Sequence, residues 1–124
     1  MVDVGNVLGV VAVTDLDAAV TWYERFFGRP PDRRPMEGDV EWQLTSNGGL
    51  QVIQSPEHAG KGFVTLGVDD IDATLQDLAA RGVKGEAQHV GEIDGMPLRI
   101  AEFTDPAGNT VVVASQSGRR DARA

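Results

Sequence analysis

The sequence predicts an α+β domain in which one βαβββ module is used twice, giving a cupped mixed sheet around a cavity with the helices outside. The main observation is that TDLDAAV, at 14–20, is echoed by DDIDATL, at 69–75. Superposing the two segments also superposes Val13 on Val68. Agreement over both a strand end and a helix start indicates a duplicated module, because chance similarity seldom extends over two element types.

The first module begins with an apolar and β-branched run at 6–13, which is typical of a buried strand. Apolar residues at three-to-four spacing follow from Leu16 to Phe27 and predict a helix that ends at Gly28. A weaker strand is expected near 33–38, since the sheet needs a further edge.

A hairpin is expected next, because VEWQLT and LQVIQ flank Ser46-Asn47-Gly48-Gly49. A two-residue Asn47-Gly48 loop places Gln51 beside Trp42, whereas a three-residue loop places it beside Gln43. The second register gathers the apolar residues on one face against the helices and is favoured, but both remain open.

The second module repeats this order. It is predicted to contain a strand at 63–68, a helix from Ile71 to Arg81-Gly82, and strands near 85–92, 97–104 and 109–114. The expected boundaries are a single domain at 1–117, with modules at about 5–56 and 62–116 and a basic tail at 118–124.

Composition excludes several classes of protein. The chain has 124 residues, no cysteine and a formal net charge of −8, so it offers no disulfide or thiolate chemistry and repels nucleic acid. The N-terminus lacks a leader pattern, and no apolar run reaches the roughly 20 residues that span a bilayer. We therefore expect a cytoplasmic protein with a small-molecule partner and no nucleic-acid or membrane partner.

No serine-hydrolase elbow, zinc-protease helix, phosphate loop or dinucleotide fingerprint occurs in the sequence. Four aspartates stand at the two helix starts and are predicted to cap the helices rather than to act in catalysis: Asp15, Asp17, Asp70 and Asp72. Glu37, Asp39 and Glu41 alternate along one strand and are predicted to form a solvated edge.

The βαβββ repeat, with TDLDAAVTWYERFFG near its start and DPAGNTVVV near its end, resembles the vicinal oxygen chelate superfamily. That superfamily includes glyoxalase I, extradiol dioxygenases, fosfomycin-modifying enzymes and bleomycin resistance proteins. The resemblance covers 6–115 and implies a homodimer. It also implies that catalytic members hold a divalent metal through His, Glu or Gln on the first and last strand of each module.

At the four positions that this resemblance assigns to metal ligands, the chain has Leu8, Gln51, Phe63 and Val112. One amide cannot hold a divalent transition metal, so no metal and no other cofactor are expected. The two histidines, His58 and His89, fall away from these strand positions and are expected to be exposed or structural.

The leading hypothesis is a metal-independent binding protein that sequesters an aromatic or cationic compound, with no catalytic residues. The alternatives are a lyase, isomerase or dioxygenase with an atypical site, and a structural or interaction module. Ligand-binding residues are expected to be Leu8, Trp42, Gln43, Gln51, Phe63, Arg99 and Val112.

Overall fold

The structure is a computed structural model that describes residues 2–116, so the basic tail expected at 118–124 lies outside the described residues. The chain divides into two compact units. The first contains the residues up to Val64 together with Thr104–Thr110, and the second contains Thr65–Phe103 and the described residues from Val111 onward. In the described part of the chain, no helix has the length and apolar character needed to cross a membrane.

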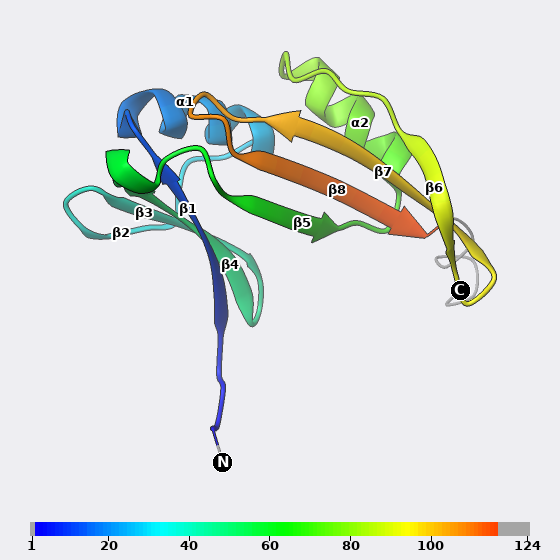
Figure 1. Cartoon of the computed structure of the whole chain (residues 1–124), viewed down its shortest axis with the longest axis horizontal. Coiled ribbons are helices and arrows are strands. Elements are labelled where there is room, and N and C mark those ends of the chain that lie inside the picture. The colour runs from blue at the N-terminus through cyan, green and yellow to red at the C-terminus, as the bar shows by residue number, and fades with distance from the viewer. Residues whose placement is uncertain (1, 117–124) are drawn as a thin grey trace. The chain divides into compact units, whose positions relative to one another are not determined.

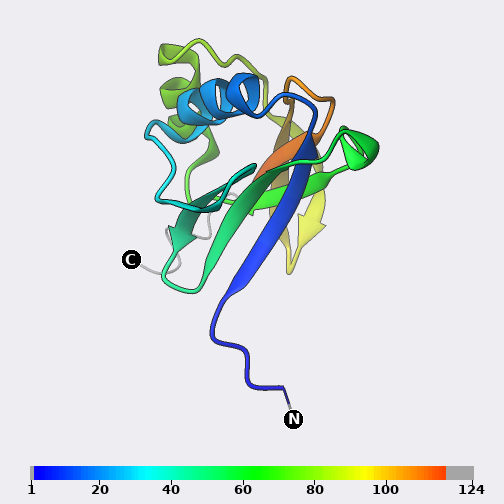
Figure 2. The same ribbon diagram turned by 90° about the vertical axis from the view of Figure 1, so that its left-hand side faces the viewer.

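The first sheet has the strand order β1-β4-β3-β2, with β1 parallel to β4 and the other pairs antiparallel (Figures 1 and 2). Its elements are β1 (Val7–Val13), α1 (Leu16–Phe27), β2 (Arg33–Met36), β3 (Asp39–Thr45) and β4 (Gly48–Gln54). A short 3₁₀ helix, η1 (Pro56–His58), follows β4.

The second sheet repeats this arrangement, with the order β5-β8-β7-β6. Its elements are β5 (Phe63–Gly67), α2 (Ile71–Ala80), β6 (Gln88–Ile93), β7 (Met96–Thr104) and β8 (Thr110–Gln116). In both sheets the first strand pairs with the last, so the prediction of two βαβββ modules is confirmed.

Helix α1 begins and ends where its sequence dictates. The Asp15 carboxylate accepts a hydrogen bond from the Ala18 amide, and Gly28 ends the helix in the left-handed conformation with φ 77°. The buried face of α1 presents Tyr23, whose ring lies 5.9 Å from that of Trp42. The core of the first unit therefore lies between α1 and one face of the first sheet.

Helix α2 follows the same rule, because the Asp70 carboxylate accepts a hydrogen bond from the Ala73 amide. Asp15 and Asp70 thus cap the helices, as the sequence predicts. Asp17 and Asp72 instead lie within the first turns, and Asp72 pairs with Arg99. Among the described residues of the second unit, the buried ones are Ile71, Leu78, Val83, Ala101, Phe103, Val111, Val112, Val113 and Ser115.

The hairpin between β3 and β4 differs from both registers that the sequence suggests. Thr45 pairs with Gly48, which leaves Ser46-Asn47 as the loop, and an irregularity in β3 then pairs Gln43 with Gly49. The strand faces are nevertheless those of the favoured register, since Gln43 and Gln51 share one face. The other face carries apolar residues that are buried, namely Val40, Trp42, Leu50 and Val52, whereas Leu44 at the irregularity is half-buried.

The turn at 105–109 is held within the first unit by a buried polar network. The Asp105 carboxylate accepts hydrogen bonds from the Tyr23 hydroxyl and the Asn109 side-chain amide, both at 2.8 Å. Asn109 also donates to the Ala12 carbonyl at 2.8 Å and accepts from the Gly62 amide at 2.7 Å. Burial raises the pKa of the Tyr23 phenol, and the Asp105 carboxylate raises it further.

Candidate functional site

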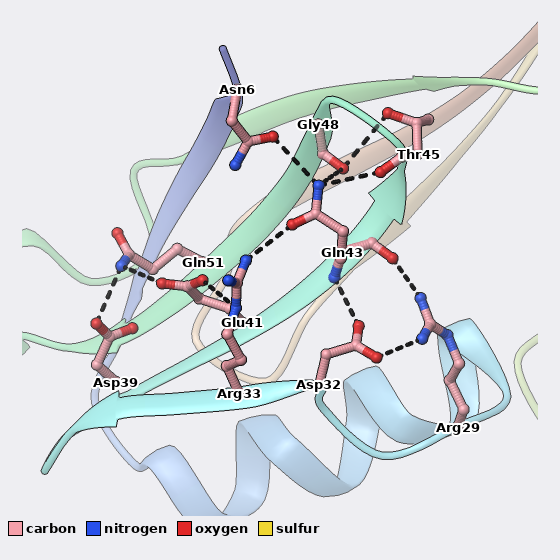
Figure 3. Close-up of polar contacts among 10 residues, drawn as sticks. All are labelled: Asn6, Arg29, Asp32, Arg33, Asp39, Glu41, Gln43, Thr45, Gly48 and Gln51. Carbon is pink, nitrogen blue, oxygen red and sulfur yellow. Dashed lines mark hydrogen bonds and ion pairs between the residues drawn. The ribbon is translucent and has the colours of Figure 1, made fainter.

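One face of the first sheet carries a row of polar side chains. Cross-strand pairing places Arg33 opposite Glu41, Glu41 opposite Gln51, and Gln51 opposite Val10. Residues directly opposite each other share a face of the sheet, so the polar row crosses β2, β3 and β4 on the face opposite Trp42 and meets the apolar Val10 in β1. We call Arg33, Glu41 and Gln51, together with Asp39 two residues along β3, the carboxylate row (Figure 3).

Gln51 joins the two carboxylates of this row. Its amide nitrogen, Nε2, donates to Asp39 Oδ2 at 3.0 Å and to Glu41 Oε2 at 3.2 Å. On the other side of Glu41, Arg33 Nε lies 3.4 Å from Oε1. The second oxygen of Asp39, Oδ1, is shielded from water and has no hydrogen-bond partner among the described residues.

Burial distinguishes these carboxylates from an ordinary strand edge. Asp39 and Glu41 are each 7% exposed, whereas Glu37 is exposed. The prediction of a solvated edge is therefore wrong for Asp39 and Glu41, because β3 is an interior strand between β2 and β4 and both residues are buried. Loss of hydration raises the pKa of Asp39, the nearby Glu41 charge raises it further, and the hydrogen bond from Gln51 lowers it.

A second polar group on the same face surrounds Gln43. Its side-chain oxygen accepts a hydrogen bond from Arg33 at 2.9 Å, and its amide nitrogen donates to Asn6 at 3.2 Å and to the Thr45 carbonyl at 3.0 Å. These bonds satisfy Gln43 and hold Arg33 beside Glu41 (Figure 3). Gln43 thus contacts the row directly through Arg33.

The predicted site residues are only partly brought together. Leu8, Gln43 and Gln51 lie on the same face of the first sheet, because Leu8 pairs with Gly49 and Gly49 with Gln43. Trp42 lies on the opposite face, is fully buried, and donates its indole N–H to the Arg29 carbonyl at 3.0 Å.

The remaining predicted residues lie in the second sheet. Phe63 begins β5 with its side chain 69% exposed, and Val112 is buried in β8. Arg99 in β7 makes two hydrogen bonds, at 2.9 and 3.0 Å, with the Asp72 carboxylate. This ion pair engages the Arg99 guanidinium and raises its pKa.

The histidines add nothing to the row. The exposed His58 lies in η1, where its Nδ1 is 3.0 Å from the Ser55 hydroxyl, and His89 lies in β6. Sequence reasoning missed Val10, Asp39 and Glu41 as neighbours of Gln51. The alternation of acids in β3 was the available signal, but only the register shows that they share the face of Gln51.

The residues at the family's metal-ligand positions do not fit a divalent metal. Leu8 and Val10, the β1 residues nearest to Gln51 on its face, carry no donor atom. Gln51 itself presents N–H groups, not its oxygen, to the two carboxylates. Within residues 2–116, no three His, Cys, Asp or Glu side chains gather in a group that could hold a metal.

A family model described as the Glyoxalase/Bleomycin resistance protein/Dioxygenase superfamily matches residues 6–113. The chain belongs to this superfamily. A glyoxalase/bleomycin resistance protein of known structure from Catenulispora acidiphila DSM 44928 is 33% identical, with a TM-score of 0.79 over 89% of this chain and 96% of that one. A search of curated proteins finds no match.

Two further proteins of known structure are less similar in sequence, and their likeness shows the fold alone. TnmS3, an antibiotic binding protein from Streptomyces sp. CB03234, is 20% identical, with a TM-score of 0.66 over 94% of this chain and 98% of that one. A lactoylglutathione lyase from Agrobacterium tumefaciens is 19% identical, with a TM-score of 0.63 over 88% and 91% of the respective chains.

The substitution Asp39→Asn is expected to raise the free energy of unfolding at neutral pH by about 1 kcal/mol, because it removes a buried, incompletely bonded charge beside Glu41. The folded protein holds a proton on Asp39 more tightly than the unfolded chain does. The stability linked to that proton is therefore fully present below the ordinary pKa of 3.8 and is lost as the pH rises through the higher pKa of the folded state. Asparagine mimics the protonated form of Asp39, so the variant keeps this stability at every pH.

Urea unfolding of the Asp39→Asn variant and the parent across a pH series measures this difference, which should disappear in acid. Glu37→Gln is the matched control, because it removes one exposed acid from the neighbouring turn. A loss of stability in Asp39→Asn at every pH would contradict the prediction.

Proposed function

We propose that this protein binds a small organic molecule without a metal, at the face of the first sheet that carries the carboxylate row. The observation that carries the proposal is the pairing of polar and apolar groups on this face. Gln51 is partly exposed between Asp39 and Glu41. On the neighbouring strand β1, Val10 lies opposite Gln51 and is 51% exposed. A few convergent polar groups beside apolar surface are typical of sites for small ligands.

The acidic composition and the donor chemistry support the same function. A net charge of −8 attracts cationic ligands, and the row supplies carboxylates to receive them. The antibiotic-binding TnmS3 has the same fold and offers a precedent for sequestration. A homodimer is part of the proposal and follows from family resemblance, with the two modules pairing either within one chain or across the dimer.

A thermal-shift screen with a broad library of aromatic and cationic compounds tests the binding function, and we expect hits among compounds that combine a cation with an apolar body. Metal analysis of the purified protein tests metal independence. Stoichiometric nickel, zinc, manganese or iron bound through Gln51 would overturn that part of the proposal, and silence across the library would overturn the binding function.

The substitution Val10→Lys localises any hit, because it places a competing ammonium group directly opposite Gln51. We expect affinity to fall at least about tenfold, the effect of losing one good charged contact. Val7→Lys is the matched control, since Val7 lies on the same strand, is 63% exposed, and points to the other face. Equal losses in both variants would place the site elsewhere.

A further inference from the structure

The position of one nitrogen atom in the carboxylate row indicates the chemistry of the ligand. Gln51 Nε2 bridges Asp39 and Glu41 at 3.0 and 3.2 Å, and these two bonds use both of its N–H groups. A primary ammonium nitrogen in the same place would donate three hydrogen bonds instead of two. Asp39 Oδ1, the second oxygen of the same carboxylate, is buried without a partner among the described residues, so one acceptor of the row is unused.

The charges of the row fit a single positive charge. Asp39 and Glu41 contribute two negative charges, and Arg33 contributes one positive charge at 3.4 Å from Glu41. One negative charge therefore remains uncompensated. It lies mainly on Asp39, because Arg33 pairs with Glu41. Burying a charge in this state is costly unless a proton or a cation neutralises it.

The surroundings fit an apolar group attached to that cation. Val10 lies directly across from Gln51, and Ile53 lies directly across from Asp39. Gln51 is only partly buried, so its amide can turn away from the row at the cost of two hydrogen bonds. A ligand that supplies three charge-assisted bonds recovers more than this cost.

On the basis of the binding function proposed above, we propose that Asp39 and Glu41 receive a primary ammonium group carried on an apolar body. This group takes the position that Gln51 Nε2 now holds, and the Gln51 amide is displaced. The ligand class is therefore a lipophilic primary amine with one positive charge at this site.

Calorimetric titration with 2-phenylethylamine, with the neutral isostere 2-phenylethanol, and with potassium chloride at matched ionic strength tests the proposal. We expect the amine to bind at least about tenfold more tightly than the alcohol, because only the amine supplies charge-assisted bonds. Potassium is expected not to compete, which separates an organic ammonium group from a simple monovalent ion.

Two substitutions at contacting residues should act in opposite directions. Asp39→Asn should weaken amine binding about tenfold or more, because it removes the uncompensated charge while preserving the acceptor for Gln51. Gln51→Ala should strengthen amine binding about threefold or more, because the amine no longer displaces two hydrogen bonds. Glu37→Gln is the control for net charge and should leave amine binding unchanged.

A general loss of structure would weaken binding in both Asp39→Asn and Gln51→Ala, so opposite signs are diagnostic. Equal affinity for amine and alcohol, with Asp39→Asn unchanged, would overturn the ammonium site and leave the binding function standing. Competition by potassium, or no binding by any probe at millimolar concentration, would also overturn the ammonium site. The binding function itself is then decided by the library screen.

Discussion

Replacement of Asn109 by aspartate is expected to lower the free energy of unfolding by about 3 to 5 kcal/mol, the usual cost of an uncompensated buried charge. The Asn109 side chain is fully buried, and its amide nitrogen donates to the Ala12 carbonyl and to the Asp105 carboxylate. Aspartate would present an oxygen to each of these oxygens. It would also place a second negative charge beside Asp105 inside the first unit.

Chemical unfolding at neutral pH measures this loss. Asn47→Asp makes the same chemical change in the exposed hairpin loop and is the control, for which we expect a loss within about 1 kcal/mol. Acidification should reduce the Asn109→Asp deficit, because a protonated carboxyl regains one donor. Similar losses in the two variants would show that the network around Asp105 does not stabilise the fold as described.

Replacement of Gly60 by alanine is expected to cost about 2 to 4 kcal/mol, from a strained backbone conformation and a steric clash together. Gly60 has φ of +80°, a region that side chains disfavour. A Cβ atom at this position would also collide with the Ala107 carbonyl oxygen. Relief of the clash requires the turn at 105–109 to move, which would disturb the hydrogen bonds of Asn109.

Thermal unfolding of Gly60→Ala against Gly67→Ala checks this expectation. Gly67 has no heavy atom within 4 Å of an added Cβ, and its φ is not positive, so its substitution should change stability by no more than about 0.5 kcal/mol. A Gly60→Ala protein as stable as the parent would contradict the close approach of Gly60 to the turn at 105–109.

Much of the fold could be predicted because its signals are local. The helix from Leu16 to Phe27 has an aspartate cap, apolar periodicity and a terminating glycine, and the structure gives it the same bounds. The strand at 85–92 is shifted to Gln88–Ile93, since few apolar residues mark its start. Domain boundaries at 1–117 stay a prediction.

The candidate site was less predictable, because it depends on which residues face each other across strands. Gln51 was identified from its position in the last strand of the first module. Asp39 and Glu41 were interpreted as solvated, since alternating acids alone do not show what covers them. Register decided this, because an offset of one residue would have turned the whole of β3 over.

By itself, the sequence determined the duplicated βαβββ architecture and the identity of Leu8, Gln51, Phe63 and Val112 at the positions that the family resemblance assigns to metal ligands, because periodicity and residue identity are local properties. Only the tertiary structure decided that Gln51 bridges two buried carboxylates and that Trp42 lies on the other face of the sheet. Hydrogen bonding across strands brings distant residues together, and the irregularity in β3 that sets this pairing has no clear sequence signal.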